Sequence, residues 1–357
     1  MSIKVLNGNC LEVLDQLPEK SVDTCITSPP YYGLRDYGTA EWEGGDESCD
    51  HQVGRFEHSV SEKQKSNSAS AGHQARDICP KCGAVRKDKQ IGLEETPEEY
   101  VDKMVEVFRK VRRVLKDEGT VWLNLGDSYA SNHYTGARDS DTGWKHGELS
   151  QGYQARAGGA GGVFKVKDLM GIPWMVAFAL RADGWYLRQD IIWHKPNPMP
   201  ESVTDRCTKA HEYIFLLTKQ KKYYYDHEAI KVPVKEDWGT RDRTDGKYHN
   251  EGSGLSPHTG LEDSYKTANK RSVWTVTTKP FKGAHFAVFP PDLIKPCVLA
   301  GCPEDGTVLD PFGGAGTTGL VADRNGRNAI LIELNDEYAE MSRDRIYNDA
   351  PLFVDIE

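Results

Sequence analysis

The sequence lacks the features that mark a membrane-spanning or an exported protein. It contains no run of about 18 apolar residues, which a transmembrane helix needs, and its first residues lack the basic and then apolar pattern of a signal peptide. It also lacks an excess of positive charge, because 45 Lys and Arg stand against 54 Asp and Glu and give a net charge of −9. This balance excludes a protein covered by basic residues but leaves room for a local basic surface.

Cysteine is scarce, with 8 residues in a chain of 357. Four of them, at positions 10, 25, 207 and 297, are scattered along the sequence. Small disulfide-rich scaffolds need a far higher density of cysteine, so a disulfide framework is excluded. The cysteine content therefore predicts a protein of a reducing compartment.

Strands alternate with helices along most of the chain, which is typical of an α/β protein with a parallel sheet. The clearest helix signal is at Thr96-Pro97, where an N-cap residue and a first-turn proline precede apolar residues spaced by about 3.6 positions. The patterns predict strands at 3–6, 22–27, 120–125, 185–194, 211–217, 306–309 and 328–334, and helices at 10–17, 96–115, 166–183, 291–300, 317–325 and 336–348.

A glycine-rich turn separates a predicted strand from a predicted helix near the end of the chain. Residues 310–318 read DPFGGAGTT, and the glycines would let the backbone approach a ligand at a helix N-terminus. Glu333 ends the next strand, 20 residues after Gly313, where an acid can accept hydrogen bonds from ribose hydroxyls. The spacing indicates a nucleoside-cofactor site, and the alternative is a turn used only for strand–helix packing. The turn differs from the dehydrogenase fingerprint, which has two residues between its last two glycines.

A rigid loop, Ser28-Pro29-Pro30-Tyr31, follows the predicted strand 22–27 and should lie at the carboxyl edge of the sheet, where ligands bind. Two prolines stiffen the chain and leave outward carbonyls, with a hydroxyl and an aromatic ring beside them. An amino group on a planar ring would fit such a loop, its hydrogens on the oxygens and its ring against the tyrosine. An ordinary rigid turn is the alternative.

The loop early in the chain and the glycine-rich turn late in it together resemble the amino-group DNA methyltransferases that use S-adenosylmethionine. Their order is similar to that of the β class of this family, and residues 112–116, 193–197 and 285–290 also resemble family segments. The resemblance implies a Rossmann-like methyltransferase fold with a twisted, mostly parallel central sheet flanked by helices. It also implies methyl transfer to the exocyclic amine of a base flipped out of duplex DNA.

The resemblance assigns the cofactor site by position. The glycine-rich turn would hold the methionine and ribose portions of S-adenosylmethionine, Glu333 the ribose hydroxyls, and Phe289 with Pro290 the adenine. Asn9 and Cys10 would lie near the adenine too, although the family often has an acid there. The expected cofactor-binding residues are Asn9, Cys10, Phe289, Pro290, Asp310, Pro311, Phe312, Gly313, Gly314, Gly316, Thr317, Thr318 and Glu333.

The implied chemistry falls on Ser28, Pro29, Pro30 and Tyr31. The target amine would donate to the serine hydroxyl and the Pro29 carbonyl, which frees its lone pair for in-line displacement on the sulfonium methyl. Tyr31 would stack on the flipped base. In this family serine before Pro-Pro-Tyr is associated with cytosine N4 methylation and aspartate with adenine N6 methylation, so cytosine is favoured and adenine is the alternative. An RNA methyltransferase or a catalytically inactive DNA-binding protein of the same fold are further alternatives.

A cysteine–histidine cluster lies in the polar segment 38–90. Cys49 and His51 precede a Cys79-x-x-Cys82 pair, and three thiolates with one imidazole can close a tetrahedral zinc site that is structural and has no open position. Metal binding would stabilise a segment with little apolar material of its own. His58 could replace His51, and the alternatives are a redox pair and free thiols without a metal.

Residues 201–282 carry 15 Lys and Arg against 12 Asp and Glu, interleaved with aromatic residues, which suits a DNA-recognition surface as well as an ordinary charged edge. The expected DNA-contacting residues are Arg35, Lys195, Asn197, Arg206 and Lys209.

The predicted organisation is one catalytic domain with insertions. Residues 1–37 and 91–230 form the half with the Ser-Pro-Pro-Tyr loop, 38–90 a zinc-binding insertion, 231–272 a target-recognition insertion, and 273–357 the half that binds S-adenosylmethionine. The resemblance implies double-stranded DNA as the partner and leaves open a homodimer and a cognate restriction endonuclease. It places the protein in the cytoplasm, at the nucleoid of a prokaryote or encoded by a phage.

Overall fold

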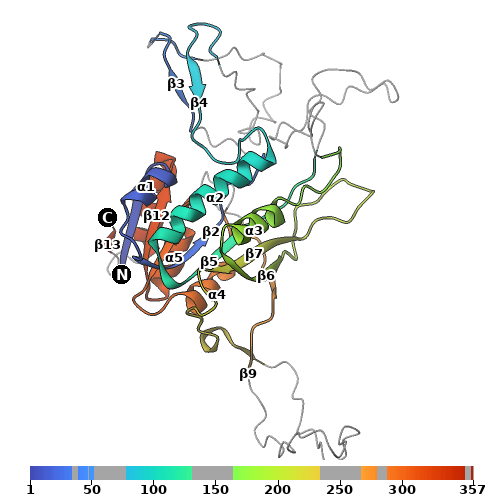
Figure 1. The fold of residues 1–357 in the computed structure, drawn as a ribbon, viewed down its shortest axis with the longest axis vertical. Helices are drawn as coiled ribbons and strands as arrows, with labels where there is room; N and C mark the ends of the chain where they lie inside the picture. Colours follow the sequence, from blue (N-terminus) through green and yellow to red (C-terminus); the bar gives the residue numbers. More distant parts are fainter. Residues whose placement is uncertain are drawn as a thin grey trace, which may run out of the picture.

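A nine-stranded sheet in the order β10-β6-β7-β5-β2-β11-β12-β1-β13 forms the centre of the fold (Figure 1). The computed structural model describes residues 1–33, 39–46, 48–51, 78–130, 164–233, 267–279, 288–349 and 355–356. The strands of this sheet are β1 (Ser2–Asn7), β2 (Val22–Thr27), β5 (Leu115–Leu125), β6 (Tyr186–His194), β7 (His211–Thr218), β10 (Val273–Thr275), β11 (Thr307–Asp310), β12 (Asn328–Glu333) and β13 (Asp355–Ile356). The two pairs that involve β7 are antiparallel and the other pairs in the described sheet are parallel, which confirms the predicted mostly parallel sheet.

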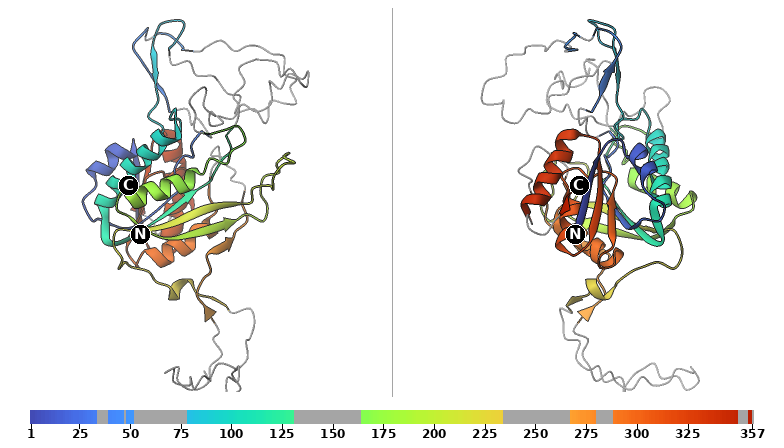
Figure 2. Two further views of the ribbon diagram at one scale, coloured as in Figure 1. Left: turned by 45° about the vertical axis from the view of Figure 1, so that its right-hand side comes forward. Right: turned by 90° about the vertical axis from the view of Figure 1, so that its left-hand side faces the viewer.

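Helices cover both faces of the sheet (Figure 2). The six helices described are α1 (Cys10–Gln16), α2 (Pro97–Val114), α3 (Ile172–Ala182), α4 (Pro291–Gly301), α5 (Thr317–Arg324) and α6 (Asp336–Asp349). The first three contribute to one apolar core, around Phe108, and the last three to another, around Leu293. The layers and the sheet confirm the Rossmann-like α/β fold.

Helix α2 shows how closely local sequence signals can set an element. The Thr96 hydroxyl accepts a hydrogen bond from the backbone N–H of Glu99, and the Glu99 side chain accepts from the backbone N–H of Thr96. This capping box satisfies two N–H groups that the first turn would otherwise leave unpaired. The buried residues that follow recur at helical spacing: Tyr100, Val101, Met104, Val107, Phe108, Val111 and Val114.

Two predicted boundaries are wrong. The helix predicted at 166–183 begins only at Ile172, because residues before it pair with the segment after β5: Lys167 N donates to Ala130 O and Met170 N to Ser128 O. The strand predicted at 120–125 begins earlier, at Leu115, directly after α2, whose end at Val114 agrees with the helix predicted at 96–115.

The predicted insertions leave the sheet at opposite ends of the molecule (Figure 1). Strands β3 (Glu41–Glu43) and β4 (Val85–Lys87) form an antiparallel hairpin that projects at one end. The short antiparallel pair β8 (Val232–Pro233) and β9 (Thr267–Ala268) lies at the other end, just after the 3-10 turn Glu228–Ile230. Most of the predicted target-recognition insertion (234–266) and the Gly-rich segment 131–163 lie outside the described residues.

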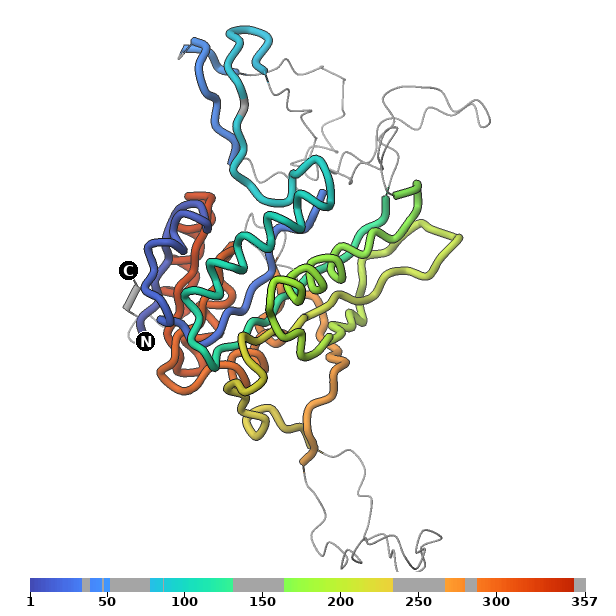
Figure 3. Tube along the Cα trace, viewed as in Figure 1, coloured from blue at the N-terminus to red at the C-terminus, as the bar shows by residue number. Residues whose placement is uncertain are grey.

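The two ends of the chain lie side by side at one edge of the sheet (Figure 3), where β1 pairs with β13 in parallel. Among the residues that the structure describes, no helix has the length and the apolar character needed to cross a membrane.

Candidate active site

A cavity of about 650 Å³ lies at the edge of the sheet where β1, β2, β11 and β12 end. Each of these strands brings a lining residue: Asn9 follows β1, Ser28 follows β2, Asp310 ends β11 and Glu333 ends β12. Parallel strands end at the same edge of a sheet, so these segments meet although they lie far apart in the sequence. The cavity thus joins the Ser-Pro-Pro-Tyr loop to the glycine-rich turn.

The glycine-rich turn is held against β12 by hydrogen bonds. Gly313 N donates to Ile332 O at 2.8 Å, and Gly314 N donates to the Glu333 carboxylate at 2.7 Å. The backbone of Gly316 has φ of 73°, and a Cβ atom there would lie 2.3 Å from the Ser342 hydroxyl, so glycine is required. The Glu333 carboxylate also accepts from a second backbone N–H, and burial raises its pKa. A carboxylate has about four acceptor sites, so lone pairs remain for ribose hydroxyls in the cavity.

Asp310 is buried at the cavity wall and holds two strands together. Its carboxylate accepts from the hydroxyls of Thr27 and Thr318, each at 2.6 Å, and from Phe312 N at 3.1 Å. Burial raises its pKa to about 7, although these hydrogen bonds act in the opposite direction. The side chain is therefore both a structural link and a negative charge that forms near neutral pH.

Most of the expected cofactor-binding residues line the cavity. Asn9 also caps helix α1, because its side chain accepts from Leu11 N. The neighbouring Cys10 has a pKa raised to about 12 by burial, so it presents a neutral thiol. The lining residues among those expected are Asn9, Cys10, Phe289, Asp310, Pro311, Phe312, Gly313, Gly314, Thr317 and Glu333. Pro290, Gly316 and Thr318 do not line the cavity: Pro290 precedes α4, Gly316 precedes α5, and the Thr318 hydroxyl donates to Asp310.

All four residues of the Ser-Pro-Pro-Tyr loop also line the cavity. Tyr100 of α2 donates from its hydroxyl to the Pro30 carbonyl at 2.9 Å, which fixes the loop against the helix. The Tyr31 ring lies against Gly126, where a Cβ atom would come within 2.6 Å of the ring. Its hydroxyl donates to Glu212 at 2.7 Å. The Tyr31 ring is therefore held in place at both its edge and its hydroxyl.

Sequence reasoning missed a group of lining residues on the antiparallel side of the sheet. Strand β7 runs opposite to β5 and β6, so its first residues reach the edge where β5 and β6 end. This arrangement brings Glu212 beside Asn124 and opposite Trp193. The signal would have been that the strand at 211–218 runs antiparallel to its neighbours. In that direction the first residues of the strand, and not the last, lie at the edge of the sheet that forms the site. The other lining residues missed include Gly8, Gln90, Ile91, Thr278, Leu334 and Tyr338.

The expected DNA-contacting residues are engaged within the protein. Lys195 forms an ion pair with Glu212 inside the cavity, and Asn197 is fixed to the backbone of Thr278 by two hydrogen bonds. Arg206 pairs with Glu201 and lies 3.8 Å from the centre of the Tyr129 ring, while Lys209 donates to Asp127 O at 2.6 Å. Arg35 lies outside the described residues.

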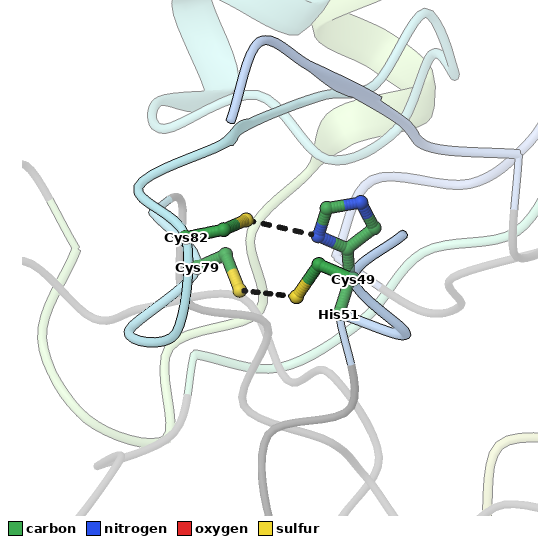
Figure 4. Close-up of side chains that lie close together, drawn as sticks. All are labelled: Cys49, His51, Cys79 and Cys82. Atoms are coloured by element: carbon green, nitrogen blue, oxygen red, sulfur yellow. Dashed lines mark hydrogen bonds between the residues drawn. The ribbon is translucent and has the colours of Figure 1, made fainter. Parts of the chain in front are cut away.

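The four cysteine–histidine residues predicted to bind a metal converge at the hairpin (Figure 4). One ligand atom from each of Cys49, His51, Cys79 and Cys82 lies within 4.8 Å of every other. Ligands at about 2.0–2.3 Å from a tetrahedral zinc ion are roughly 3.3–3.8 Å apart, so small movements would close the site. The pKa of Cys79 is lowered to about 6, with the His51 hydrogen bond as the largest cause, so this thiol readily becomes a thiolate. His58, the alternative ligand, lies outside the described residues.

Comparison with known proteins identifies the family. Residues 22–344 match the family of N6/N4 methyltransferases described as DNA methylase. The chain belongs to this family. Its relatives among the N6/N4 DNA methylases include the type II methyltransferase M.SmaI from Serratia marcescens, which is 41% identical over 97% of this chain and 91% of the relative. M.Cfr9I from Citrobacter freundii is 38% identical over 97% of this chain and 88% of the relative.

Solved structures share the fold at low sequence identity. The cytosine-N4-specific PvuII DNA methyltransferase has a TM-score of 0.56 and 17% identity, with 100% of this chain and 96% of that chain covered. A Thermus thermophilus protein solved in complex with S-adenosyl-L-methionine has a TM-score of 0.53 and 20% identity, with 99% and 97% covered. These likenesses agree with the fold of the N6/N4 DNA methylases.

Proposed function

We propose that this N6/N4 DNA methylase transfers a methyl group from S-adenosylmethionine to the N4 amine of a cytosine flipped out of duplex DNA. The observation that carries the proposal is that Ser28 and Glu333 line one and the same cavity. Sites of about 300–1,000 Å³ can hold a cofactor-sized ligand. The near full-length similarity to type II methyltransferases supports the same activity.

The residues present fit the cofactor. Glu333 would accept from the ribose hydroxyls, and the backbone of the glycine-rich turn can approach the ligand because Gly313 and Gly314 carry no side chain. Asp310 would face the positively charged methionine portion, and Phe289 would pack on the adenine. When bound, S-adenosylmethionine supplies an electrophilic methyl group on a sulfonium.

The chain's own groups would prepare the amine. Its N–H groups would donate to the Ser28 oxygen and the Pro29 carbonyl, while the Pro30 carbonyl accepts from Tyr100 and holds the loop in place. The nitrogen lone pair would form the new N–C bond to the methyl group that the sulfonium gives up, with the bonding electrons kept by sulfur, and the methylated amine would lose one proton to solvent. Positioning and electrostatics would supply most of the rate gain, without a covalent enzyme intermediate.

Serine in the catalytic loop favours cytosine over adenine. A neutral hydroxyl is a weaker acceptor than the carboxylate that the family associates with adenine. The test is methyl transfer from radiolabelled S-adenosylmethionine to duplex DNA, followed by digestion to nucleosides. Labelled N4-methylcytosine is expected; labelled N6-methyladenine would favour the alternative base. Transfer to RNA alone, or cofactor binding without any transfer, would replace the proposal with the RNA methyltransferase or the inactive DNA-binding protein.

We also propose that the loop between β6 and β7 contacts DNA at the opening of the cavity. Pro198 and Met199 line the cavity, and the Met199 side chain is 86% exposed. Two hydrogen bonds between Asn197 and Thr278 anchor the loop just before this point. Apolar side chains that enter a duplex stabilise the gap left by a displaced base. Met199 would fill that gap, while Lys195 and Asn197 would lie beside the flipped cytosine.

We also propose that Cys49, His51, Cys79 and Cys82 bind a structural zinc ion. The convergence of three thiols and one imidazole supports the assignment, as does the small two-stranded sheet, which has few buried apolar residues of its own. A zinc site would stabilise this hairpin in the way that metal binding folds other small domains.

A further inference from the structure

Three polar side chains that the catalytic loop does not contain, Asn124, Lys195 and Glu212, form a network with its tyrosine. The Tyr31 hydroxyl lies 2.7 Å from Glu212 Oε2 and 3.3 Å from Asn124 Oδ1. Asn124 Nδ2 donates to the same Glu212 oxygen at 3.2 Å, and Lys195 Nζ pairs with the other carboxylate oxygen. All four residues line the cavity that also contains Ser28.

The direction of each hydrogen bond follows from the chemistry of the groups. A carboxylate only accepts, so the Tyr31 O–H must donate to Glu212. Asn124 Nδ2 also donates to the Tyr213 carbonyl at 3.0 Å, and these two acceptors fix the orientation of its amide. The Tyr31 oxygen is then an acceptor, and the Ser28 hydroxyl donates to it at 3.3 Å. The Ser28 proton therefore points toward Tyr31 and leaves oxygen lone pairs for a group in the cavity.

The charged groups beside the Ser28 and Tyr31 hydroxyls favour one direction of donation, from Ser28 to Tyr31 and from Tyr31 to Glu212. The Lys195 and Glu212 side chains are only 19% and 15% exposed, and the lysine ammonium lies 4.2 Å from the centre of the Trp193 ring. Each charge is thus fixed by its partner, and the carboxylate stays an acceptor. Burial, followed by the Glu212 charge, raises the pKa of Tyr31 well above its ordinary value, so the phenol keeps the proton that it donates.

We propose that Glu212 is a positioning residue for methyl transfer, which acts through the Tyr31 hydroxyl to present the Ser28 oxygen as the acceptor for the target amine. This role rests on the proposed amino-methyltransferase function. Without Glu212, the Tyr31 hydroxyl can turn toward Ser28 and donate to it, and the serine can in turn point its proton into the cavity. A proton there would face the N–H groups of the amine instead of accepting from them.

The role can be separated from the stacking role expected for the ring. Tyr31→Phe keeps the ring and the Lys195–Glu212 ion pair but removes the hydroxyl, so it tests the hydrogen-bond chain with little risk to folding. Glu212→Gln replaces the acceptor-only group with an amide that can donate. The matched control is Glu228→Gln, the same change at an exposed glutamate that pairs with Lys231 and does not line the cavity.

The experiment measures the single-turnover rate of methyl transfer to duplex DNA at saturating cofactor, together with the dissociation constant of S-adenosylmethionine. We expect Tyr31→Phe and Glu212→Gln each to lower the rate about 10- to 100-fold, with cofactor affinity changed less than about threefold. The double variant should be no slower than Tyr31→Phe alone, because Glu212 acts through the hydroxyl that this change removes. Glu228→Gln should keep the wild-type rate.

Two results would overturn the positioning role. One is a wild-type rate in Tyr31→Phe. The other is an equal loss from Glu212→Gln in the presence and in the absence of the Tyr31 hydroxyl, which is what a merely structural glutamate would produce. A wild-type protein that transfers no methyl group to DNA would overturn the proposed function, and this role with it, whereas the two results above contradict the positioning role alone.

Discussion

The hydroxyl of Thr27 donates a 2.6 Å hydrogen bond to the carboxylate of Asp310, 283 positions later in the chain. Thr27 is the last residue of β2, directly before the Ser-Pro-Pro-Tyr loop, and Asp310 is the last residue of β11, directly before the glycine-rich turn. The two strands are neighbours in the sheet. This buried bond therefore sets the distance between the two motifs that the proposed reaction must bring together.

Asp310 should make stability depend on pH in a defined direction. Its pKa is raised from an ordinary value of 3.8 to about 7, so the folded state favours the protonated form. The stability that it contributes is fully present below about pH 4 and is lost as the pH rises toward about 7. Relative to Asp310→Asn, the free energy of unfolding of the wild type should fall by about 4 kcal/mol over this range, at about 1.36 kcal/mol per pKa unit.

Denaturant unfolding at a series of pH values, without cofactor, measures this difference. The comparison with Asp310→Asn cancels the titration of groups that do not interact with Asp310. A free-energy difference that stays constant from pH 4 to pH 8 would show that Asp310 does not titrate in this range.

The hairpin metal site should be needed for cofactor binding as well as for local folding. Gln90 and Ile91 come shortly after β4 and line the cavity, and Thr39, just before β3, lines it too. The Thr39 hydroxyl and the backbone N–H of Gln90 both donate to Asp88, which ties the two ends of the hairpin segment together. Loss of zinc should loosen this part of the wall and weaken binding of S-adenosylmethionine about tenfold.

Metal analysis of protein purified without chelator should give one zinc ion per chain. Cys82→Ser should lower this content and the cofactor affinity together, while Cys207→Ser, which changes an exposed cysteine outside the cluster, should change neither. Less than one zinc per chain in the wild type would count against the metal site. Full cofactor affinity in zinc-free Cys82→Ser would show that binding of S-adenosylmethionine does not depend on the metal site of the hairpin.

The sequence predicted the parts of the molecule that local signals specify. Thr96 and Glu99 form a capping box, which depends only on residues close together in the sequence. Gly316 has a left-handed backbone conformation, and a side chain there would clash with Ser342. The order of strands and turns was sufficient to bring Ser28 and Glu333 to one edge. Each of these predictions depends on a few adjacent residues or on the general rule that parallel strands end together.

What the sequence did not predict depends on partners far along the chain. The start of α3 at Ile172 is set by Asp127, whose carboxylate accepts from the N–H groups of Gly171 and Ile172. Glu212 became a site residue only because β7 runs antiparallel beside β5. Lys195, expected to contact DNA, has an ion pair with that glutamate that the sequence did not predict. Such pairings follow from strand direction, which hydrophobic periodicity does not report.

Gly126 should be required for the position of Tyr31. A Cβ atom at this glycine would lie 2.6 Å from the Tyr31 ring and 3.3 Å from the Glu212 carboxyl carbon, closer than atoms can pack without movement. Gly126→Ala should therefore displace the ring and lower the transfer rate at least about tenfold, since a misplacement of about 1 Å can cost a hundredfold. Cofactor affinity should stay within about threefold of the wild type, because Gly126 is not among the residues that line the cavity. A wild-type transfer rate in Gly126→Ala would show that the Tyr31 ring does not need this position.

Met199 should matter for opening the duplex and not for the methyl transfer itself. Its 86% exposed side chain stands at the cavity mouth, on a loop that Asn197 anchors to Thr278. Met199→Ser removes the apolar contact that would replace the displaced cytosine in the base stack. The transfer rate on fully paired DNA should fall about tenfold, because unstacking a paired base costs a few kcal/mol that a wedge offsets only in part.

A substrate with the target cytosine opposite an abasic position separates the two steps. The cytosine is already unpaired there, so Met199→Ser should transfer to it at nearly the wild-type rate. Val203→Ser is the control, since Val203 is also exposed on the loop between β6 and β7 but does not line the cavity. An equal fall in the transfer rate of Met199→Ser on both substrates would contradict this role. The Met199 side chain would then act on the bound base or on the cofactor, because a base that is already unpaired does not need to be displaced from the stack.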